Sequence, residues 1–305
     1  MTGVIFFTKM RGNGDEFIVI DNRQYNYCPA ELATLARDLC LEKNVLAGGG
    51  LLVFEKTRDP SQHFFMRAFN CDGTEEFLSG NGARCLAGLA FQIGIAPREM
   101  VFGFSGGTVQ ATVEPASQDP ATAVVTLDMG EVDLAQAHWH QVFPFWGKTF
   151  LYHALSIGGI PHCVILLDHL EDLSPSDLVP LARGLRFDEK RFPEGTNVNF
   201  LERDEEGQGV RLLTYQRNVN RLTSSCGTAI AAGGIVACLS LGYSSPVSVT
   251  TPGGISEVTV RQDTTSPEKV RISLRGEASC LTKGTILFDA RSTFRTARTV
   301  CAPLL

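Results

Sequence analysis

The chain has 305 residues, of which 44% are hydrophobic and 20% charged, and its formal net charge is −6. This composition is typical of a folded globular protein long enough for two domains, and the negative charge argues against nucleic-acid binding. No apolar run is long enough to span a bilayer, and the first residues lack a signal-peptide pattern. Nine scattered cysteines without a CxxC pair suit a reducing compartment, so we expect a cytoplasmic protein.

Short runs rich in Val, Ile and Phe, separated by Gly, Pro, Asn and Asp, predict strands along most of the chain. In chain order they cover residues 16–21, 50–55, 64–69, 123–130, 162–168, 197–202, 210–217, 248–251 and 270–276. Helical patterns are fewer: residues 28–43, the segment after Ser79, residues 176–186 and the segment after Cys226. Because the spacing favours hairpins over a regular βαβ alternation, we expect an α+β fold with mostly antiparallel sheets.

Two helix starts repeat one pattern. Ser79 precedes a helical segment, and 27 residues later the pair 106–107 forms a Gly-Gly turn before an alternating strand. Cys226 precedes the second such segment, and the pair 253–254 follows at the same separation. An identical separation of helix, turn and strand indicates duplicated halves.

The repeat predicts two pseudo-symmetric lobes, each a mostly antiparallel sheet wrapped round a central helix. We expect an N-terminal lobe over 1–128 and a C-terminal lobe over 129–283, with 284–305 returning to the first. Residues 127–136 are the expected crossover. Small residues on one face of each helix suit close packing inside such a sheet; they are Ala83, Ala87 and Gly88 in the first, and Ala229, Ala232 and Gly233 in the second.

The first N–H groups of a helix lack internal partners, and the helix dipole adds partial positive charge at that end. Glycines there let the backbone approach a ligand closely, so two such ends suit a carboxylate. The same field favours the thiolate form of a cysteine, which could remove a proton from the carbon beside that carboxylate. The alternative is that Ser79 and Cys226 are ordinary helix caps.

Several motifs resemble landmarks of the diaminopimelate epimerase family over nearly the whole chain, from about Phe7 to Phe288. They are, in order, GNGDEFIVID, FNCDGTEEFLSGNGARC, GGIPHCV, TNVNF, YQRNVNRLTSSCGTA, PGG and RGEA. The resemblance implies two similar α/β domains with the active site in the cleft between them. It also implies racemisation or epimerisation without pyridoxal, another cofactor or a metal ion, by two cysteines on opposite faces of Cα.

Site residues follow from the resemblance position by position. Cys226 matches one catalytic cysteine, Ser79 stands where the other should be, and His162 matches a histidine near that pair. The helix-start positions that bind the α-carboxylate correspond to Gly80, Asn81, Gly227 and Thr228. The substrate-binding positions correspond to Asp15, Asn70, Asn197, Gln216 and Arg217, of which Arg217 suits a bidentate carboxylate contact.

The chain also departs from the family pattern. Gln216 replaces a glutamate, Ile160 replaces an asparagine before Pro161 and His162, and Gly14-Asp15-Glu16 replaces a GND sequence. A glycine-rich segment that carries a glutamine in the family is LAGGGLL here. The segment from Arg217 to Cys226 is about one residue longer and carries Arg221. These changes leave open whether the substrate is diaminopimelate or a related amino acid.

Ser79 leaves three interpretations open, because a serine hydroxyl is a far weaker base than a thiolate. It could donate a proton with an ordered water, an arrangement that resembles hydroxyproline epimerases. Cys226 could instead be the single base of an isomerase or dehydratase acting on a hydroxy or unsaturated carboxylic acid. The serine could also mark an inactive carboxylate-binding protein. In each case the expected partner is a small molecule, with no nucleic acid and no membrane, and a homodimer is possible.

Overall fold

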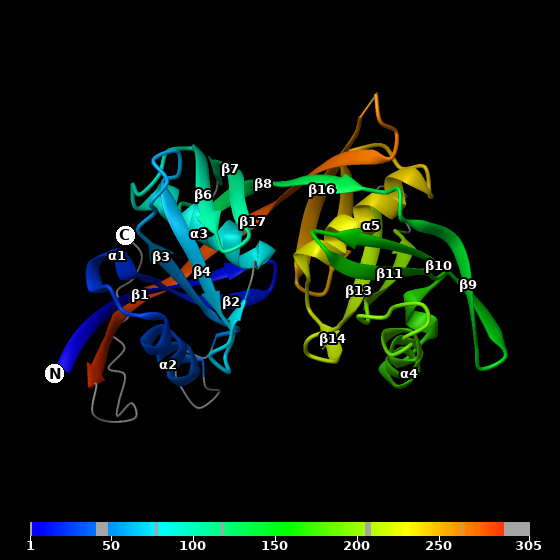
Figure 1. Cartoon of the computed structure of the whole chain (residues 1–305), viewed down its shortest axis with the longest axis horizontal. Coiled ribbons are helices and arrows are strands. Elements are labelled where there is room, and N and C mark those ends of the chain that lie inside the picture. Colours follow the sequence, from blue (N-terminus) through cyan, green and yellow to red (C-terminus); the bar gives the residue numbers. More distant parts are fainter. Residues whose placement is uncertain are drawn as a thin grey trace. The chain divides into compact units, whose positions relative to one another are not determined.

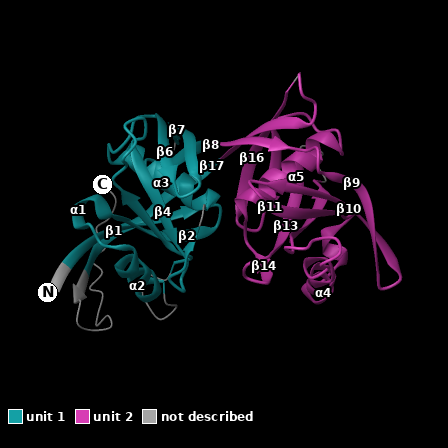
Figure 2. Cartoon of the chain, in the orientation of Figure 1, with its two compact units in different colours: residues 1–127, 276–305 teal, residues 128–275 magenta. Residues whose placement is uncertain are grey.

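The computed structural model describes residues 2–40, 48–76, 79–116, 119–204, 209–263 and 265–289. The chain forms two compact units, Met1–Leu127 with Gly276–Leu305, and Asp128–Arg275 (Figure 2). It passes from one unit to the other within two long strands, β8 (Thr122–Asp133) and β17 (Lys269–Asp289). The return therefore begins at Gly276 and not at residue 284.

In unit 1, the strands precede and follow one long helix, α3. Its elements are β1 (Thr2–Gly12), β2 (Asp15–Asp21), α1 (Asn22–Tyr25), α2 (Pro29–Leu39), β3 (Leu51–Glu55), β4 (Phe64–Phe69), β5 (Glu75–Glu76), α3 (Gly80–Gln92), β6 (Glu99–Phe104) and β7 (Gly107–Pro115), with the first half of β8 and the second half of β17.

Unit 2 has the same order of elements after one additional strand. Its elements are β9 (His138–Phe145), β10 (Lys148–Ile157), β11 (Ile160–Leu166), the 3-10 turn η1 (Leu170–Asp172), α4 (Pro175–Arg186), β12 (Asn197–Arg203), β13 (Gly209–Gln216), β14 (Arg221–Thr223), α5 (Gly227–Leu239), β15 (Val247–Thr251) and β16 (Gly254–Gln262).

Strand pairing repeats from unit to unit. In unit 1, β1 pairs antiparallel with β2, β2 parallel with β3, β3 antiparallel with β4, and β4 parallel with β6. In unit 2, β10, β11, β12, β13 and β15 make the same four pairings in the same order. The hairpins β6–β7 and β15–β16 then follow α3 and α5. The mostly antiparallel pairing expected from the sequence is confirmed.

Each unit encloses one helix within its sheet. In Figure 1, α5 lies among β10, β11, β13 and β16, and α3 likewise contacts β1, β2, β3, β4 and β7. Both are buried along almost their whole length, whereas α2 and α4 bury only the face that packs on the sheet. A helix buried on every side is usually apolar all round, as α5 is, whereas α3 also buries the polar side chains of Asn81 and Arg84.

Small residues allow this enclosure. The expected positions Ala83, Ala87, Ala229 and Ala232 are fully buried. A Cβ atom on Gly234 would lie 2.5 Å from Cγ1 of Val258 on β16, closer than two carbon atoms can approach. The sheet therefore contacts the helix backbone directly at this point.

The predicted helices after Ser79, after Cys226 and over 176–186 are confirmed, and so are the nine predicted strands. The helix expected over 28–43 ends at Leu39, and residues 41–43 lie outside the described residues. The described residues form seventeen strands and five α-helices. The fold therefore contains more sheet, relative to helix, than the α+β expectation implied. Within those residues, no helix combines the length and apolar character needed to cross a bilayer.

Replacing Gly234 by Ala should destabilise unit 2 by about 1–3 kcal/mol, since the new methyl group overlaps Val258. Gly233→Ala is the matched control on the same helix, because its Cβ would meet only the ends of two flexible side chains, Leu212 at 3.2 Å and Leu201 at 3.4 Å. That control should be close to neutral, since alanine is the better helix former. Urea unfolding measures both, and a Gly234→Ala protein as stable as the wild type would contradict the packing described.

Candidate functional site

Ser79 is the N-cap of α3. Its backbone is extended, with φ −100° and ψ 115°, and its Oγ accepts a 3.1 Å hydrogen bond from the Gly82 amide. Gly82 is required by packing as well, because a Cβ there would lie 2.8 Å from Cδ2 of Leu52 on β3. Serine is among the strongest N-cap residues, and the enclosing sheet fixes where the helix begins.

A buried polar network supports this helix start. The Asn81 side chain is 3% exposed, and its Nδ2 donates a 2.8 Å hydrogen bond to Oδ2 of Asp15 on β2. Its Oδ1 accepts a short hydrogen bond from Nη2 of Arg84, which is fully buried one turn further along α3. Asn81 thus joins β2 to α3, so its side chain serves the protein and only its backbone amide is suited to a ligand.

Burial dominates the charges around this network. It raises the pKa of the Asp15 carboxyl, although the Asn81 hydrogen bond and the charge of Arg84 oppose that shift. It also raises the pKa of Glu76 on β5, with a further contribution from the negative charge of Asp15. Burial lowers the pKa of the Arg84 guanidinium. Two carboxyl groups and one guanidinium therefore share a weakly solvated region at the start of α3.

Cys226 is the N-cap of α5, with φ −149° and ψ 117°, but its side chain makes no capping hydrogen bond. Its Sγ lies 3.4 Å from Oγ1 of Thr228, and its carbonyl accepts from the Ile230 amide at 2.9 Å. The side chain is partly buried, and the following Gly227 is buried. The two helix starts thus differ in chemistry: the serine hydroxyl is used as a cap and the thiol is not.

His162 lies on β11 and is fully buried. Its Nδ1 is 3.3 Å from Nδ2 of Asn199 on β12, and Oδ1 of Asn199 accepts from Oγ1 of Thr214 on β13 at 3.1 Å. Nε2 of His162 is buried and has no hydrogen-bond partner among the described residues. Burial, together with the nearby charge of Arg217, lowers the pKa of His162 to about 3. The imidazole is therefore neutral at physiological pH.

Arg217 follows directly after β13 and is partly exposed. Its amide donates a 2.7 Å hydrogen bond to Oδ1 of Asn197, and its Nη1 donates to the carbonyl of Glu194 at 3.2 Å. Asn197 is 4% exposed and pairs in register with His162. Gln216 is the last residue of β13 and pairs with Arg221 on β14. Unit 2 thus groups His162, Asn197 and Arg217 at the ends of neighbouring strands.

Asn70 is in a different setting. It lies in the exposed turn between β4 and β5, where its amide donates to the carbonyl of Thr74 at 2.8 Å and its Nδ2 to Oγ1 of Thr74 at 3.1 Å. No hydrogen bond among the described residues connects it to the pair Asp15–Asn81. The structure therefore joins Asp15 with Asn81, Asn197 with Arg217, and Cys226 with Thr228; the catalytic and binding roles of the twelve residues stay predictions.

Two supporting residues were missed by the sequence reasoning although both lie in quoted motifs. Arg84 follows Asn81 by three residues in GNGARC, which places the two on one helix face. Asn199 follows Asn197 by two residues in TNVNF, which places the two on one face of the strand. Polar residues at these spacings inside buried elements were the available signal.

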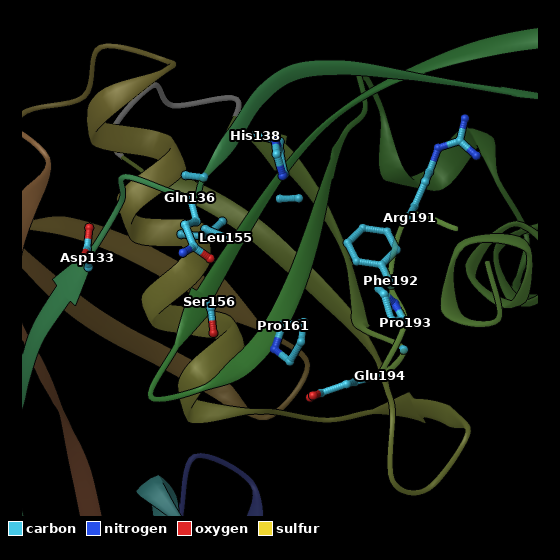
Figure 3. A pocket seen from close by; sticks show the side chains of 13 residues that line it. Asp133, Gln136, His138, Leu155, Ser156, Pro161, Arg191, Phe192, Pro193 and Glu194 are labelled. Carbon is cyan, nitrogen blue, oxygen red and sulfur yellow. The ribbon is translucent and has the colours of Figure 1, made fainter. Parts of the chain in front are cut away.

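Unit 2 also has an open pocket of about 530 Å³ (Figure 3). Its walls come from three places: residues 133–138 before β9, the β10–β11 hairpin, and the loop 191–195. None of the predicted site residues lines it, but Pro161 precedes His162, and the carbonyl of Glu194 holds Arg217. The loop 191–195 therefore lies between this pocket and Arg217.

Comparisons with known proteins agree with this pattern. The family model described as diaminopimelate epimerase matches residues 7–135 and 155–281. A diaminopimelate epimerase from Hydrogenobaculum sp. is 31% identical over 93% of this chain and 99% of that protein, and one from Methanocella arvoryzae is 36% identical over 82% and 88%. The solved structure of a hydroxyproline epimerase from Agrobacterium vitis superposes with a TM-score of 0.65 at 16% identity, covering 94% of each chain.

The repeated pairing with an enclosed helix in each unit defines a class of two-unit folds that this hydroxyproline epimerase structure shares. Within that class, the chain belongs to the diaminopimelate epimerase family.

Neutral His162 should make the protein sensitive to acid. Its folded pKa of about 3 lies below the ordinary value near 6.5, so the unfolded chain binds more protons in between. Stability from this group is therefore complete above about pH 6.5 and is lost as the pH falls toward 3. Between pH 7 and 4.5 we expect the wild type to lose about 2–3 kcal/mol more of its free energy of unfolding than His162→Gln.

Urea unfolding at both pH values measures this difference. His153, whose pKa burial lowers to about 4, is present in both proteins and cancels in the comparison. Equal acid sensitivity of the wild type and the variant would contradict a buried, neutral His162.

Proposed function

We propose that this chain is a pyridoxal-independent racemase or epimerase that inverts the α-carbon of an amino acid, either diaminopimelate or a relative of it. Membership of the diaminopimelate epimerase family supports the reaction class. The single observation that carries the assignment of residues is the pair of helix starts, with Ser79 as the N-cap of α3 and Cys226 as the N-cap of α5. In this proposal both helix starts act on one substrate.

The α-carboxylate binds to the backbone amides at the two helix starts, from Gly80 and Asn81 in one unit and Gly227 and Thr228 in the other. Helix N-termini stabilise anions through their N–H groups and dipoles. When the α-proton leaves, negative charge spreads onto this carboxylate, and fixed N–H donors stabilise that charge more than they stabilise the ground state. The same contacts therefore bind the substrate and lower the barrier.

Cys226 is the base in this proposal. Its thiolate removes the proton from Cα and becomes a thiol, leaving the electron pair on Cα and the carboxylate as an enediolate. A thiol that does not cap its helix can turn toward a substrate without uncovering an amide.

Ser79 is the proton donor on the opposite face, acting with an ordered water. Its oxygen already accepts the Gly82 amide, which makes it a poorer base but leaves its O–H available to donate. The Ser79 hydroxyl gives its proton to Cα and takes a proton from the water. Solvent then reprotonates the water, and the Cys226 thiol releases its proton to solvent, which restores the starting state. His162, neutral and buried, would orient groups near this pair.

The far end of the substrate binds to Arg217, with Asn70, Asn197, Gln216 and Asp15 as further substrate-binding residues. Arg217 presents a guanidinium fork that suits a second carboxylate. We propose in addition that the protein needs no cofactor or metal, works in the cytoplasm, can form a homodimer, and has two pseudo-symmetric lobes that arose by duplication.

Exchange with heavy water tests the proposed reaction. L,L-diaminopimelate and a panel of L- and D-amino acids are incubated with the enzyme in deuterium oxide, and both the deuterium at Cα and the configuration are measured. We expect deuterium to enter together with inversion. Cys226→Ala should reduce the exchange rate by a factor of 10² to 10⁴ or more, because general-base catalysis contributes about that much.

Thr223→Ala is a control that alters the same strand-to-helix segment without touching the thiol. Exchange without inversion would establish the one-base isomerase or dehydratase alternative instead. Binding without any exchange would establish a carboxylate-binding protein, and full activity in Cys226→Ala would remove Cys226 from the mechanism.

A further inference from the structure

Arg186, the last residue of α4, lies between two stretches of backbone, one at Gly195 and one at Arg217. Its Nη2 donates a long hydrogen bond of 3.5 Å to the carbonyl of Arg217. Its Nη1 occupies the space where a side chain at position 195 would begin: a Cβ on Gly195 would lie 1.7 Å from that nitrogen. Gly195 also has φ +68°, a conformation that glycine adopts most easily. The guanidinium of Arg186 is thus packed between Gly195 and Arg217.

This packing connects the loop that holds the Arg217 side chain with the backbone at the end of β13. Glu194, next to Gly195, accepts from Nη1 of Arg217 through its carbonyl, and Asn197 accepts from the Arg217 amide. Arg186 therefore fixes the distance between the loop 191–195 and the end of β13. Losing its guanidinium would leave Arg217 with the same two bonds but a looser support.

The charge around the two arginines is not balanced. Neither guanidinium has a carboxylate within 4.0 Å in the described part of the chain, and their hydrogen-bond acceptors there are the carbonyls of Glu194 and Arg217. Nε of Arg186 is buried and lacks an acceptor among those residues. Burial, and then the charge of Arg217, lower the pKa of Arg186. Two adjacent positive charges without a counter-ion attract an anion.

We propose that Arg186 is a positioning and specificity-determining residue: it holds Arg217 and adds a second positive charge that selects substrates carrying an anionic carboxylate at the end remote from the reacting carbon. The inference rests on the proposed function, since it concerns the substrate of that reaction. What the inference adds is the role of Arg186: a residue outside the proposed site sets how strongly Arg217 favours a substrate with a second carboxylate over one with a neutral or cationic end.

Two substrates separate this role from a merely structural one. L,L-diaminopimelate and L-lysine share the same reacting end and the same chain length, but only the former has the second carboxylate. For Arg186→Met we expect the KM for diaminopimelate to rise about tenfold or more with kcat changed little, because a contact made equally in the ground and transition states is lost. The KM for any turnover of lysine should not rise, because lysine lacks the carboxylate that Arg186 attracts, and Arg186→Lys should recover part of the loss with diaminopimelate.

Arg183 offers a matched control. It lies one turn earlier on α4 and stacks on the same Phe187 ring, at 5.2 Å against 4.9 Å for Arg186. Arg183→Met removes one charge and one ring contact from the same helix, so it should leave both substrates unaffected. An equal effect of Arg186→Met on both substrates, or the same effect from Arg183→Met, would overturn the specificity role.

Binding of pimelate, a dicarboxylate without amino groups, provides a readout that does not need turnover. Pimelate should raise the Tm of the wild type and of Arg183→Met, and raise that of Arg186→Met clearly less. If no amino acid is turned over but pimelate stabilises the three proteins to these different extents, the proposed function fails and the role of Arg186 in binding an anion stands. If diaminopimelate is turned over normally by Arg186→Met and pimelate stabilises all three proteins equally, the inference fails and the proposed function stands.

Discussion

The burial of a helix inside the sheet of each unit is the constraint on which the rest of the structure depends. A helix surrounded by strands cannot shift along its axis without losing contacts on every side, so its first residue is fixed relative to the sheet. In unit 2, the close packing of helix and sheet depends on Gly234, where the helix backbone and Val258 are in direct contact. In unit 1, it depends on Gly82, which lies against the Leu52 side chain. The N-cap positions of α3 and α5 follow from this packing.

The same backbone arrangement supports different chemistry in the two units. At the start of α3, Ser79 caps the helix, and the buried group Asp15, Asn81 and Arg84 balances its own charges. At the start of α5, Cys226 makes no capping bond. Elsewhere in unit 2, burial and the charge of Arg217 keep His162 neutral, and Arg186 bonds to the carbonyl of Arg217. The N-cap side chain thus has a structural use in unit 1, whereas the thiol at the same position in unit 2 is not used as a cap.

Much of this arrangement could be predicted from the sequence. The equal spacing of Ser79 and Cys226 from their Gly-Gly turns predicted two related halves, and the strand pairing does repeat from unit to unit. Runs rich in Val, Ile and Phe between turn residues identified the strands because most strand side chains are buried, on both faces in β3 and β12. The Ala and Gly content of both central helices indicated close packing, which the burial of Ala87 and Ala232 confirms.

Other features could not be predicted because they depend on contacts distant in sequence. The Asp15–Asn81 bond joins residues 66 positions apart, and the His162–Asn199 contact joins residues 37 apart. Position 186 is an ordinary helix-terminal arginine in the sequence, and only packing against Gly195 and Arg217 distinguishes it from Arg183. The chain returns to unit 1 at Gly276, whereas the sequence predicted this return at residue 284. The prediction was too late because a single 21-residue strand, β17, serves both units without a turn to mark the boundary.

We propose that residues 79 and 226 act on one carbon atom, and a thiol at position 79 tests this proposal directly. Ser79→Cys can be oxidised with diamide and its tryptic peptides analysed by mass spectrometry, with Ser79→Cys/Cys226→Ala as the control. We expect a disulfide to form between positions 79 and 226, and we expect bound diaminopimelate to prevent its formation. A Ser79→Cys protein that binds diaminopimelate yet forms no such bond under any oxidising condition would contradict the account.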